Sequence, residues 1–186
     1  LLDHPRFSFV NDSILNEDLM DRMVRQADLI YHLAAVVGVK YVVEDPLHGI
    51  YTNVKGTEVV LETAYKYWKR IVLASSSEVY GKSQDVPFCE DADRLLGSTT
   101  QARWSYASSK AADEFLALAY HRQTGLPVVI FRLFNTVGPR QTGRYGMVVP
   151  RLVSQALAGG CLTVYGDGGQ SRCFLFLHLC DSNLLS

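Results

Sequence analysis

The feature that most constrains the fold of this chain is a regular alternation of short apolar runs with longer segments of helical periodicity. The apolar runs lie at 7–10, 28–35, 71–77, 127–134 and 162–165, and we expect each to form a strand. The helical segments lie between and after them, at 16–26, 50–68, 106–122 and 147–158. Such alternation is typical of α/β proteins, so the sequence predicts a doubly wound, Rossmann-like parallel sheet.

Two of these segments carry further local signals. The run DLIYHLAA at 28–35 is apolar nearly throughout, which predicts a strand buried on both of its faces. The segment at 16–26 has Glu17 and Asp18 near its start, and acidic side chains there stabilise the positive end of the helix dipole. We therefore expect a helix to begin at about Asn16.

Polar or small residues lie at the points where the expected strands end. Asp12 follows the first strand, Ala34 and Ala35 end the second, residues 75–78 end the third, and Asn135 follows the fourth. Ligands of open parallel sheets bind beyond the carboxyl ends of the strands. The sequence thus predicts a binding site at this edge of the sheet.

The segment RWSYASSK places Tyr106 four residues before Lys110, on one face of an expected helix. A phenol has a pKa of about 10, and a neighbouring ammonium favours the phenolate and lowers that pKa. With a hydroxyl from a strand end such as Ser76, the pair is suited to removing the proton of an alcohol while hydride leaves its carbon. The same spacing also fits a phenol at the edge of the core beside a solvated lysine, which is common on helices.

Composition excludes some classes of partner. Lys and Arg number 18 against 19 Asp and Glu, and the net charge of -1 gives no support to binding of nucleic acid or of a membrane surface. The cysteines have no metal-ligand or disulfide spacing, so we expect reduced thiols, no metal and a cytoplasmic protein. These cysteines are Cys89, Cys161, Cys173 and Cys180.

Five strings, in this order, resemble the extended short-chain dehydrogenase/reductase family. They are LAA at 33–35, SSSEVYG at 75–81, YASSK at 106–110, RLFNTVGPR at 132–140 and LTVYGDGGQSR at 162–172. More narrowly, they look like its NAD-dependent nucleotide-sugar epimerases, dehydratases and decarboxylases. The resemblance implies NAD as cofactor, a nucleotide sugar, UDP-linked in our reading, as substrate, and a reaction that begins with oxidation at sugar C4.

The resemblance also implies roles for the matching positions. Tyr106 would be the catalytic base, with Lys110 binding the nicotinamide ribose and Ser76 hydrogen-bonding the reacting hydroxyl. Glu78 is a further catalytic candidate. The cofactor would also lie against Asp12, Leu33, Ala34, Ala35 and Ser75. The candidates for substrate binding are Ser76, Ser77, Asn135, Arg144, Tyr165 and Arg172.

The triplet Ser76-Ser77-Glu78 separates the possible reactions. It lacks the aspartate of the dehydratase Asp-Glu pair, and together with SRCF at 171–174 it resembles the enzymes that act on uronic acids. We expect a UDP-sugar 4-epimerase, on UDP-glucose or UDP-glucuronate. The alternatives are a UDP-glucuronate decarboxylase, a dTDP-glucose 4,6-dehydratase and, in another class, a non-catalytic remnant that binds nucleotide sugars.

The glycine-rich turn G-x-x-G-x-x-G, which cradles the cofactor pyrophosphate in the family, does not occur in the sequence. We therefore expect a chain that lacks the first strand-helix-strand unit and most of the C-terminal substrate domain. Residues 1–145 would form a partial NAD-binding domain and 146–186 the start of the substrate-binding region. Such a chain would bind NAD weakly and would form a homo-oligomer that covers its apolar edges.

Overall fold

The computed structural model of the chain describes residues 4–143 and 147–177. Its elements follow one another as α1 (Glu17–Gln26), β1 (Leu29–His32), α2 (Val39–Glu44), α3 (Pro46–Lys66), β2 (Arg70–Ser76), the 3₁₀ turn η1 (Ser77–Tyr80), α4 (Trp104–Thr124), β3 (Val128–Leu133), β4 (Asn135–Val137), α5 (Val148–Leu157) and β5 (Phe174–Phe176).

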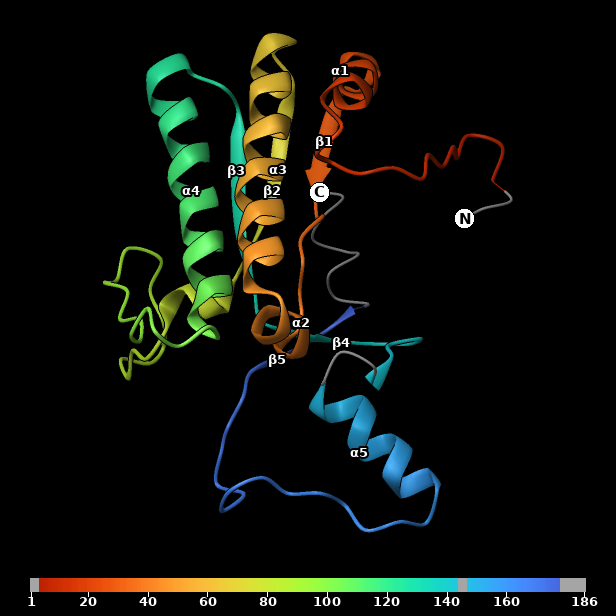
Figure 1. The fold of residues 1–186 in the computed structure, drawn as a ribbon, viewed down its shortest axis with the longest axis vertical. Helices are drawn as coiled ribbons and strands as arrows, with labels where there is room; N and C mark the ends of the chain where they lie inside the picture. The colour runs from red at the N-terminus through yellow and green to blue at the C-terminus, as the bar shows by residue number, and fades with distance from the viewer. Residues whose placement is uncertain (1–3, 144–146, 178–186) are drawn as a thin grey trace.

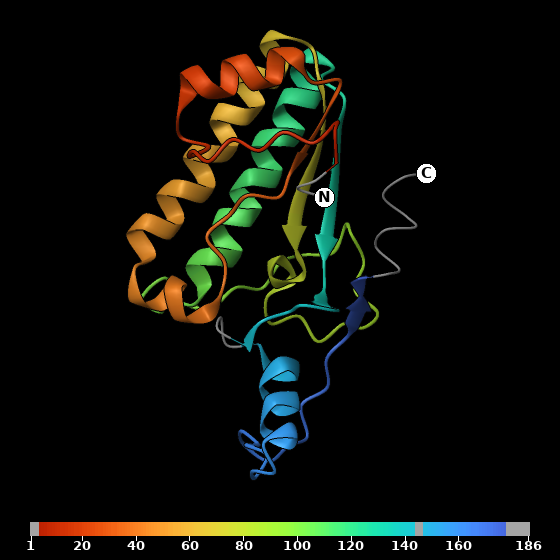
Figure 2. The same ribbon diagram turned by 90° about the vertical axis from the view of Figure 1, so that its right-hand side faces the viewer.

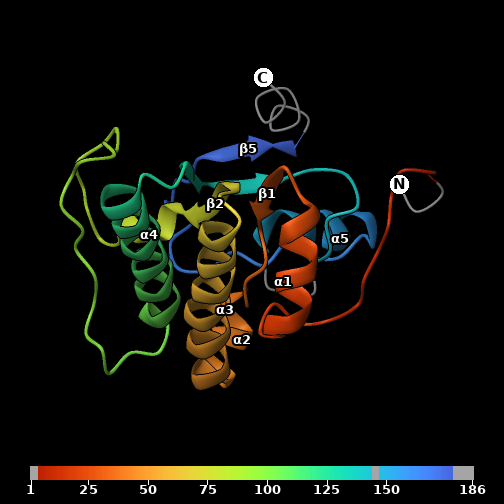
Figure 3. The ribbon, with the colours of Figure 1, turned by 90° about the horizontal axis from the view of Figure 1, so that it is seen from above.

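The main sheet has the strand order β1-β2-β3, and all of its pairs are parallel. Helices α1, α3 and α4 lie against one face of this sheet, and α5 lies beyond the carboxyl ends of the strands (Figures 1 and 2). Seen from above, the three helices form a layer beside the strands (Figure 3). The expected α/β class with a parallel, Rossmann-like sheet is confirmed.

Residues at the helix ends explain where the long helices begin and stop. The carboxylate of Asp45 accepts a hydrogen bond from the His48 N–H, 3.1 Å away, and Pro46 occupies the first helical position of α3. At the other end of the helical layer, α4 stops at Gly125, which has a left-handed backbone with φ of 80°. These caps account for helices longer than the sequence periodicity alone predicts.

The core lies between the sheet and the layer of helices. Its fully buried apolar residues come from every layer, and they are Val60, Leu61, Ala64, Ile71, Leu73, Ala117 and Leu126. Because β2 is the central strand, Ile71 and Leu73 lie beneath both long helices. This packing fixes the position of α4 relative to the end of β2.

Two expected strands are absent. Residues 7–10 and 162–165 are extended but unpaired, and Phe9 and Val164 are 71% and 67% exposed. A strand requires a neighbour for its backbone hydrogen bonds, and no described strand lies beside either segment. The structure instead pairs β4 with β5 in parallel, from segments that the sequence did not indicate as strands.

The run 28–35 also differs from its prediction. Only Leu29–His32 forms the strand β1, and Leu29 and Tyr31 are 38% and 41% exposed. The reason is that β1 lies at the edge of the described sheet, and no helix of the described residues covers its second face (Figure 2). The expected burial on both faces is therefore wrong for this part of the chain.

Core packing predicts the effect of shortening a side chain of α3. Leu61 is fully buried, so Leu61→Ala should lower the free energy of unfolding by about 2–5 kcal/mol through lost contacts and a cavity. Leu47→Ala on the same helix removes a side chain that is 79% exposed and should change it by less than about 0.5 kcal/mol. Urea unfolding followed by circular dichroism measures both, and equal losses would contradict this assignment of the core.

Candidate active site

A cleft of about 400 Å³ lies at the carboxyl ends of the parallel strands. It brings together residues from four segments far apart in the sequence: the end of β1, the end of β2 with η1, the start of α4 and the start of β4. The site candidates among its lining residues are Leu33, Ala35, Ser75, Ser76, Ser77, Glu78, Tyr106, Lys110 and Asn135. Its other lining residues are mainly apolar and include Met147, Val148, Pro150 and Phe174.

The end of β2 presents two hydroxyls to different surroundings. Ser75 is buried, and its Oγ donates to Oε1 of Glu114 at 2.5 Å. The next hydroxyl, that of Ser76, caps η1 by accepting a hydrogen bond from the Glu78 N–H at 3.2 Å. Alternation along a strand therefore directs Ser75 to the helical layer and leaves Ser76 available to the cleft.

Tyr106 faces this hydroxyl from the first turn of α4. Burial raises the pKa of the Tyr106 phenol, a hydrogen bond with Ser76 opposes the rise, and the negative charges of Glu78 and Asp113 add to it. The net effect is a raised pKa. This differs from the expectation that Lys110 lowers it.

Burial is the largest cause of the raised pKa. Lys110, for its part, is bound to a carboxylate. Its ammonium donates to Oδ2 of Asp113 at 2.8 Å, and the side chains of the two residues are 3% and 0% exposed. Burial raises the pKa of Asp113, although the charge of Lys110 and the hydrogen bond from it act in the opposite direction. The carboxylate offsets the charge that was expected to act on the phenol.

A second ion pair fixes α4 to the sheet. Arg132 on β3 donates from Nε and from one terminal nitrogen to the two carboxylate oxygens of Glu114, at 3.0 and 2.8 Å. Burial acts to raise the pKa of Glu114, but the hydrogen bonds from Arg132 and Ser75 outweigh it and the pKa is lowered. The guanidinium also lies over the ring of Tyr80, 4.7 Å from its centroid. This pair ties the helix of Tyr106 to β3, and the hydrogen bond from Ser75 ties the same glutamate to β2.

His32, at the end of β1, is a further ionisable residue near Lys110. It is 4% exposed and hydrogen-bonds through Nε2 to the Thr57 hydroxyl at 3.0 Å. Burial and the nearby charge of Lys110 lower the pKa of His32 to about 4. The imidazole is neutral at physiological pH.

Several predicted site residues lie elsewhere. Asp12 is exposed and bonds its own neighbours, Ser13 and Asn16, and the exposed Ala34 is not among the residues that line the cleft. Tyr165 is 61% exposed and contacts Arg151, while Arg172 donates to the carbonyl of Ser171. Arg144 lies outside the described residues. The unpaired backbone at 7–10 and 162–165 leaves Asp12 and Tyr165 without a strand to bring them to the sheet edge.

The sequence analysis did not identify Asp113 and Glu114, the two acidic residues that bind Lys110 and Arg132. Asp113 had a signal, because it follows Lys110 by three residues on a helix, which is a spacing that allows an ion pair. The partnership of Glu114 with Arg132 had none, since 18 residues and a helix-to-strand connection separate them. The contribution of Phe174 depends on the pairing of β4 with β5 and was equally hidden.

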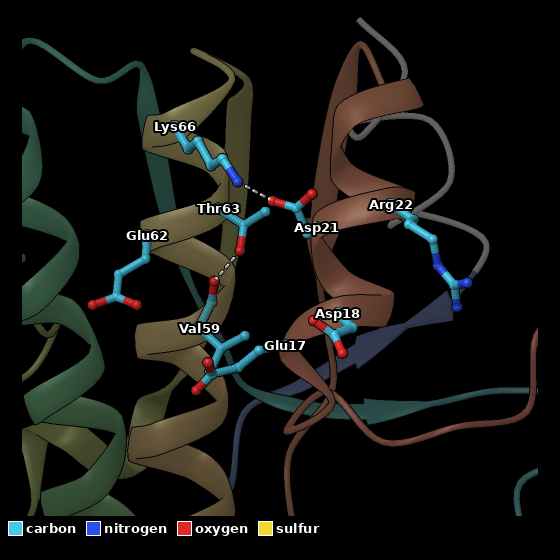
Figure 4. Close-up of a pocket in the computed structure, with 8 residues that line it drawn as sticks. All are labelled: Glu17, Asp18, Asp21, Arg22, Val59, Glu62, Thr63 and Lys66. Carbon is cyan, nitrogen blue, oxygen red and sulfur yellow. Dashed lines mark hydrogen bonds and ion pairs between the residues drawn. The ribbon is translucent and has the colours of Figure 1, made fainter.

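A larger depression, of about 700 Å³, lies between α1 and α3, away from the strand ends (Figure 4). Two of its charged groups form an ion pair: Lys66 lies 2.5 Å from Asp21, which also accepts from Tyr67 at 2.8 Å. The residues that line it are Glu17, Asp18, Asp21, Arg22, Val59, Glu62, Thr63 and Lys66. No strand of the described residues ends in this depression, so it lacks the strand-end hydroxyls of the cleft.

Other kinds of site have no support in the described part of the chain. No group of three or more His, Cys, Asp or Glu side chains there is arranged to hold a metal ion. No helix there is both long and apolar enough to cross a membrane. Cys89, Cys161 and Cys173 are free and exposed, and Cys180 lies outside the described residues.

A phenol, a lysine and a strand-end hydroxyl therefore lie around one cleft at the carboxyl ends of the parallel strands. The model of the NAD dependent epimerase/dehydratase family matches residues 2–178, and the chain belongs to this family.

Relatives of known description agree with that assignment. The chain is 49% identical over 166 residues to the UDP-N-acetyl-alpha-D-glucosaminuronate decarboxylase of Bacillus cytotoxicus, a match that covers 89% of this chain and 51% of that protein. The chain thus spans about half the length of this curated relative.

Solved structures show the same fold. A UDP-glucuronic acid 4-epimerase from Bacillus cereus, in complex with UDP-glucuronic acid and NAD, has a TM-score of 0.87 and 31% identity over 99% of this chain and 56% of its own. A UDP-N-acetylglucosamine 4-epimerase from Methanobrevibacter ruminantium, in complex with UDP-N-acetylmuramic acid, has a TM-score of 0.89 and 29% identity over 99% of this chain and 58% of its own.

The residues present fit one end of an NAD molecule. The cleft combines the polar groups of Tyr106 and Lys110 with mainly apolar lining residues, which suits a nicotinamide ring and its ribose. For the pyrophosphate, the sequence contains no G-x-x-G-x-x-G turn. The fit is therefore to the reactive half of the cofactor.

The low pKa of His32 predicts how stability depends on pH. The folded pKa of about 4 lies below the usual histidine value of 6.5, so the unfolded chain binds the proton more tightly and acid favours unfolding. Between about pH 7 and pH 5, this residue should lower the free energy of unfolding by roughly 2 kcal/mol. Urea unfolding at several pH values measures this loss.

Substitutions isolate the contribution of His32. His32→Gln keeps a partner for the Thr57 hydroxyl but does not titrate, and it should remove most of the loss. His48→Gln alters an exposed histidine on α3 and serves as the control, with the loss retained. An unchanged loss in the His32 variant would contradict the assignment.

Proposed function

We propose that this chain carries the sugar-oxidising centre of an NAD-dependent enzyme that decarboxylates a UDP-linked uronic acid. The observation that carries the proposal is the single cleft that unites Ser76, Glu78, Tyr106 and Lys110. The 49% identity to a decarboxylase of a UDP-linked uronic acid supports this choice of reaction over the 4-epimerisation that we favoured from the sequence.

The cleft residues suit the first step. NAD, when bound, supplies the acceptor for the hydride that leaves C4 of the sugar. Tyr106 is placed to take the proton of the C4 hydroxyl, and Ser76, which already bonds the phenol, is placed to hold the same oxygen. Lys110 lines the cleft beside them and can donate to a ribose hydroxyl.

The second step follows from the chemistry of the product. A ketone at C4 is β to the C6 carboxylate, so the C5–C6 electron pair can move towards the C4 carbonyl as carbon dioxide leaves. Glu78 is exposed at the cleft, where it can take part in the proton transfers that complete the reaction. Arg172 lies two residues before the lining residue Phe174, and we propose that it neutralises a carboxylate or phosphate of the substrate.

Asn135 supports the placement of the substrate near this arginine. Its side-chain amide donates to the carbonyl of Cys173 at 3.0 Å, which joins the start of β4 to the segment that bears Arg172. We propose that Asn135 and Ser77, which both line the cleft, contact the nucleotide sugar. Residues 1–145 would then hold the cofactor and 146–186 would begin the substrate-binding region.

A 4-epimerase is the second candidate. The two epimerase structures match 99% of this chain, and epimerisation needs the same oxidised intermediate, with hydride returned to the opposite face of the sugar. The two reactions differ in mass balance, since epimerisation keeps every atom of the sugar.

One experiment tests the function. The chain is incubated with NAD and, separately, with UDP-glucuronate and UDP-N-acetylglucosaminuronate, and the products are identified by mass spectrometry and by NMR of the sugar ring. Loss of the mass of carbon dioxide is the expected result. Unchanged mass with inverted C4 would establish the epimerase instead.

Absence of turnover would overturn the catalytic proposal for this chain. NAD titration by calorimetry then identifies the remaining function class. Weak binding of NAD, with saturable binding of a UDP-sugar, is the result expected of a non-catalytic nucleotide-sugar module that lacks the glycine-rich turn.

Substitution of the phenol tests its role in the reaction. Tyr106→Phe removes the group that accepts the proton and should lower kcat by at least about 100-fold. Stability should change by only about 1 kcal/mol, because the lost contact is one hydrogen bond to Ser76. Tyr51→Phe, at a position 57% exposed on α3, is the matched control. Turnover that survives in the Tyr106 variant would remove this residue from the mechanism.

A further inference from the structure

A buried pair of opposite charges lies directly behind the proposed base. Lys110 Nζ is 2.8 Å from Asp113 Oδ2, one turn further along α4, and both side chains are almost fully buried. Lys110 also lines the cleft, whereas Asp113 does not. The carboxylate therefore holds the ammonium from behind, on the side away from the cleft.

The pair is incompletely satisfied, which argues against a purely structural role. Asp113 Oδ1 is buried and makes no hydrogen bond of standard geometry, and its nearest support is a weaker interaction with the Thr57 hydroxyl that acts to lower the Asp113 pKa. Burying two charges costs more than their attraction returns unless the remaining polar atoms are bonded, and apolar residues of similar size are often as stable. A carboxylate at this position thus has an effect on Lys110 that packing does not require.

The other ionisable groups around the pair are uncharged, bound to another partner or directed towards Tyr106. His32, from β1, is uncharged above about pH 4. Glu114, the neighbouring acid on α4, is bound to Arg132 of β3. Glu78, from η1, faces Tyr106 from the exposed side of the cleft. Among the described residues, Asp113 is the carboxylate that forms an ion pair with Lys110.

We propose that Asp113 is a positioning residue that anchors the Lys110 ammonium at the wall of the cleft and offsets its charge, so that the phenol of Tyr106 keeps its proton until a ligand enters. The ammonium has three donors and Asp113 takes one, which leaves two for hydroxyls of a bound cofactor or sugar. The proposal deepens the proposed function and rests on it for the identity of the ligand, but the arrangement of charges can be measured without turnover.

The test follows the ionisation of Tyr106 in the ligand-free chain. The chain is labelled with ring-¹³C tyrosine, the Tyr106 signal is assigned from its absence in Tyr106→Phe, and its chemical shift is followed by NMR as the pH is raised. In Asp113→Asn the lost negative charge and the uncompensated Lys110 both favour the phenolate. The pKa of Tyr106 should fall by about one unit or more. Asp85→Asn, in an exposed loop, should leave it unchanged.

A double-mutant cycle shows whether Asp113 acts through Lys110. In a Lys110→Met background no ammonium remains to be offset, so adding Asp113→Asn should shift the Tyr106 pKa by less than half as much. A shift of the same size in both backgrounds would overturn the positioning role. So would an unchanged or raised pKa in the single Asp113 variant.

A measurement on the unaltered chain decides the matter if these variants fail to fold. An anchored ammonium should give a Lys110 ¹⁵N signal with slowly exchanging protons and a nuclear Overhauser effect to the β protons of Asp113. Rapid, solvent-averaged exchange at Lys110 would overturn the proposal. Because none of these measurements needs a product, failure of the proposed decarboxylation and failure of this inference are distinguishable.

Discussion

Because β2 hydrogen-bonds in parallel to β1 on one side and to β3 on the other, the carboxyl ends of three strands meet at one edge of the sheet. The buried side chains of β2, Ile71 and Leu73, pack beneath α3 and α4 and hold the helical layer in register with that edge. The first turns of α4 consequently lie beside the serines at the end of β2. The cleft exists because of this pairing, and its polar groups come from segments that begin or end there.

Helix α4 carries the charges of the site in two layers. Its cleft side presents Tyr106 and Lys110, and the residues that follow, Asp113 and Glu114, neutralise one cation each. Glu114 binds the strand through Arg132, whereas Asp113 binds the helix's own lysine. The Glu114–Arg132 pair sets where the helix lies, and the Asp113–Lys110 pair sets how much of the Lys110 charge acts on the phenol of Tyr106. Burial then dominates the ionisation of Tyr106.

The chain belongs to the NAD dependent epimerase/dehydratase family, which agrees with a cleft at the carboxyl ends of the parallel strands. The chain spans about half of its decarboxylase relative, and the cleft fits the reactive half of NAD. Helices of the described residues cover one face of the sheet (Figure 2), which leaves side chains such as Tyr31 and Val129 on the other face partly exposed. The cleft is therefore built on a sheet whose second face lacks a helical layer in the described residues.

The sequence by itself determined the parallel α/β class, the long helices and the gathering of Ser76, Tyr106 and Lys110, because hydrophobic period and strand-end position are local properties. Only the tertiary structure decided which apolar runs became strands, since 7–10 and 162–165 match the pattern but have no hydrogen-bonding neighbour. It also decided the charge state of the site. A pKa depends on burial and on the charges brought nearby by folding, and the carboxylate of Asp113 offsets the ammonium that the sequence alone led us to expect would act on the phenol.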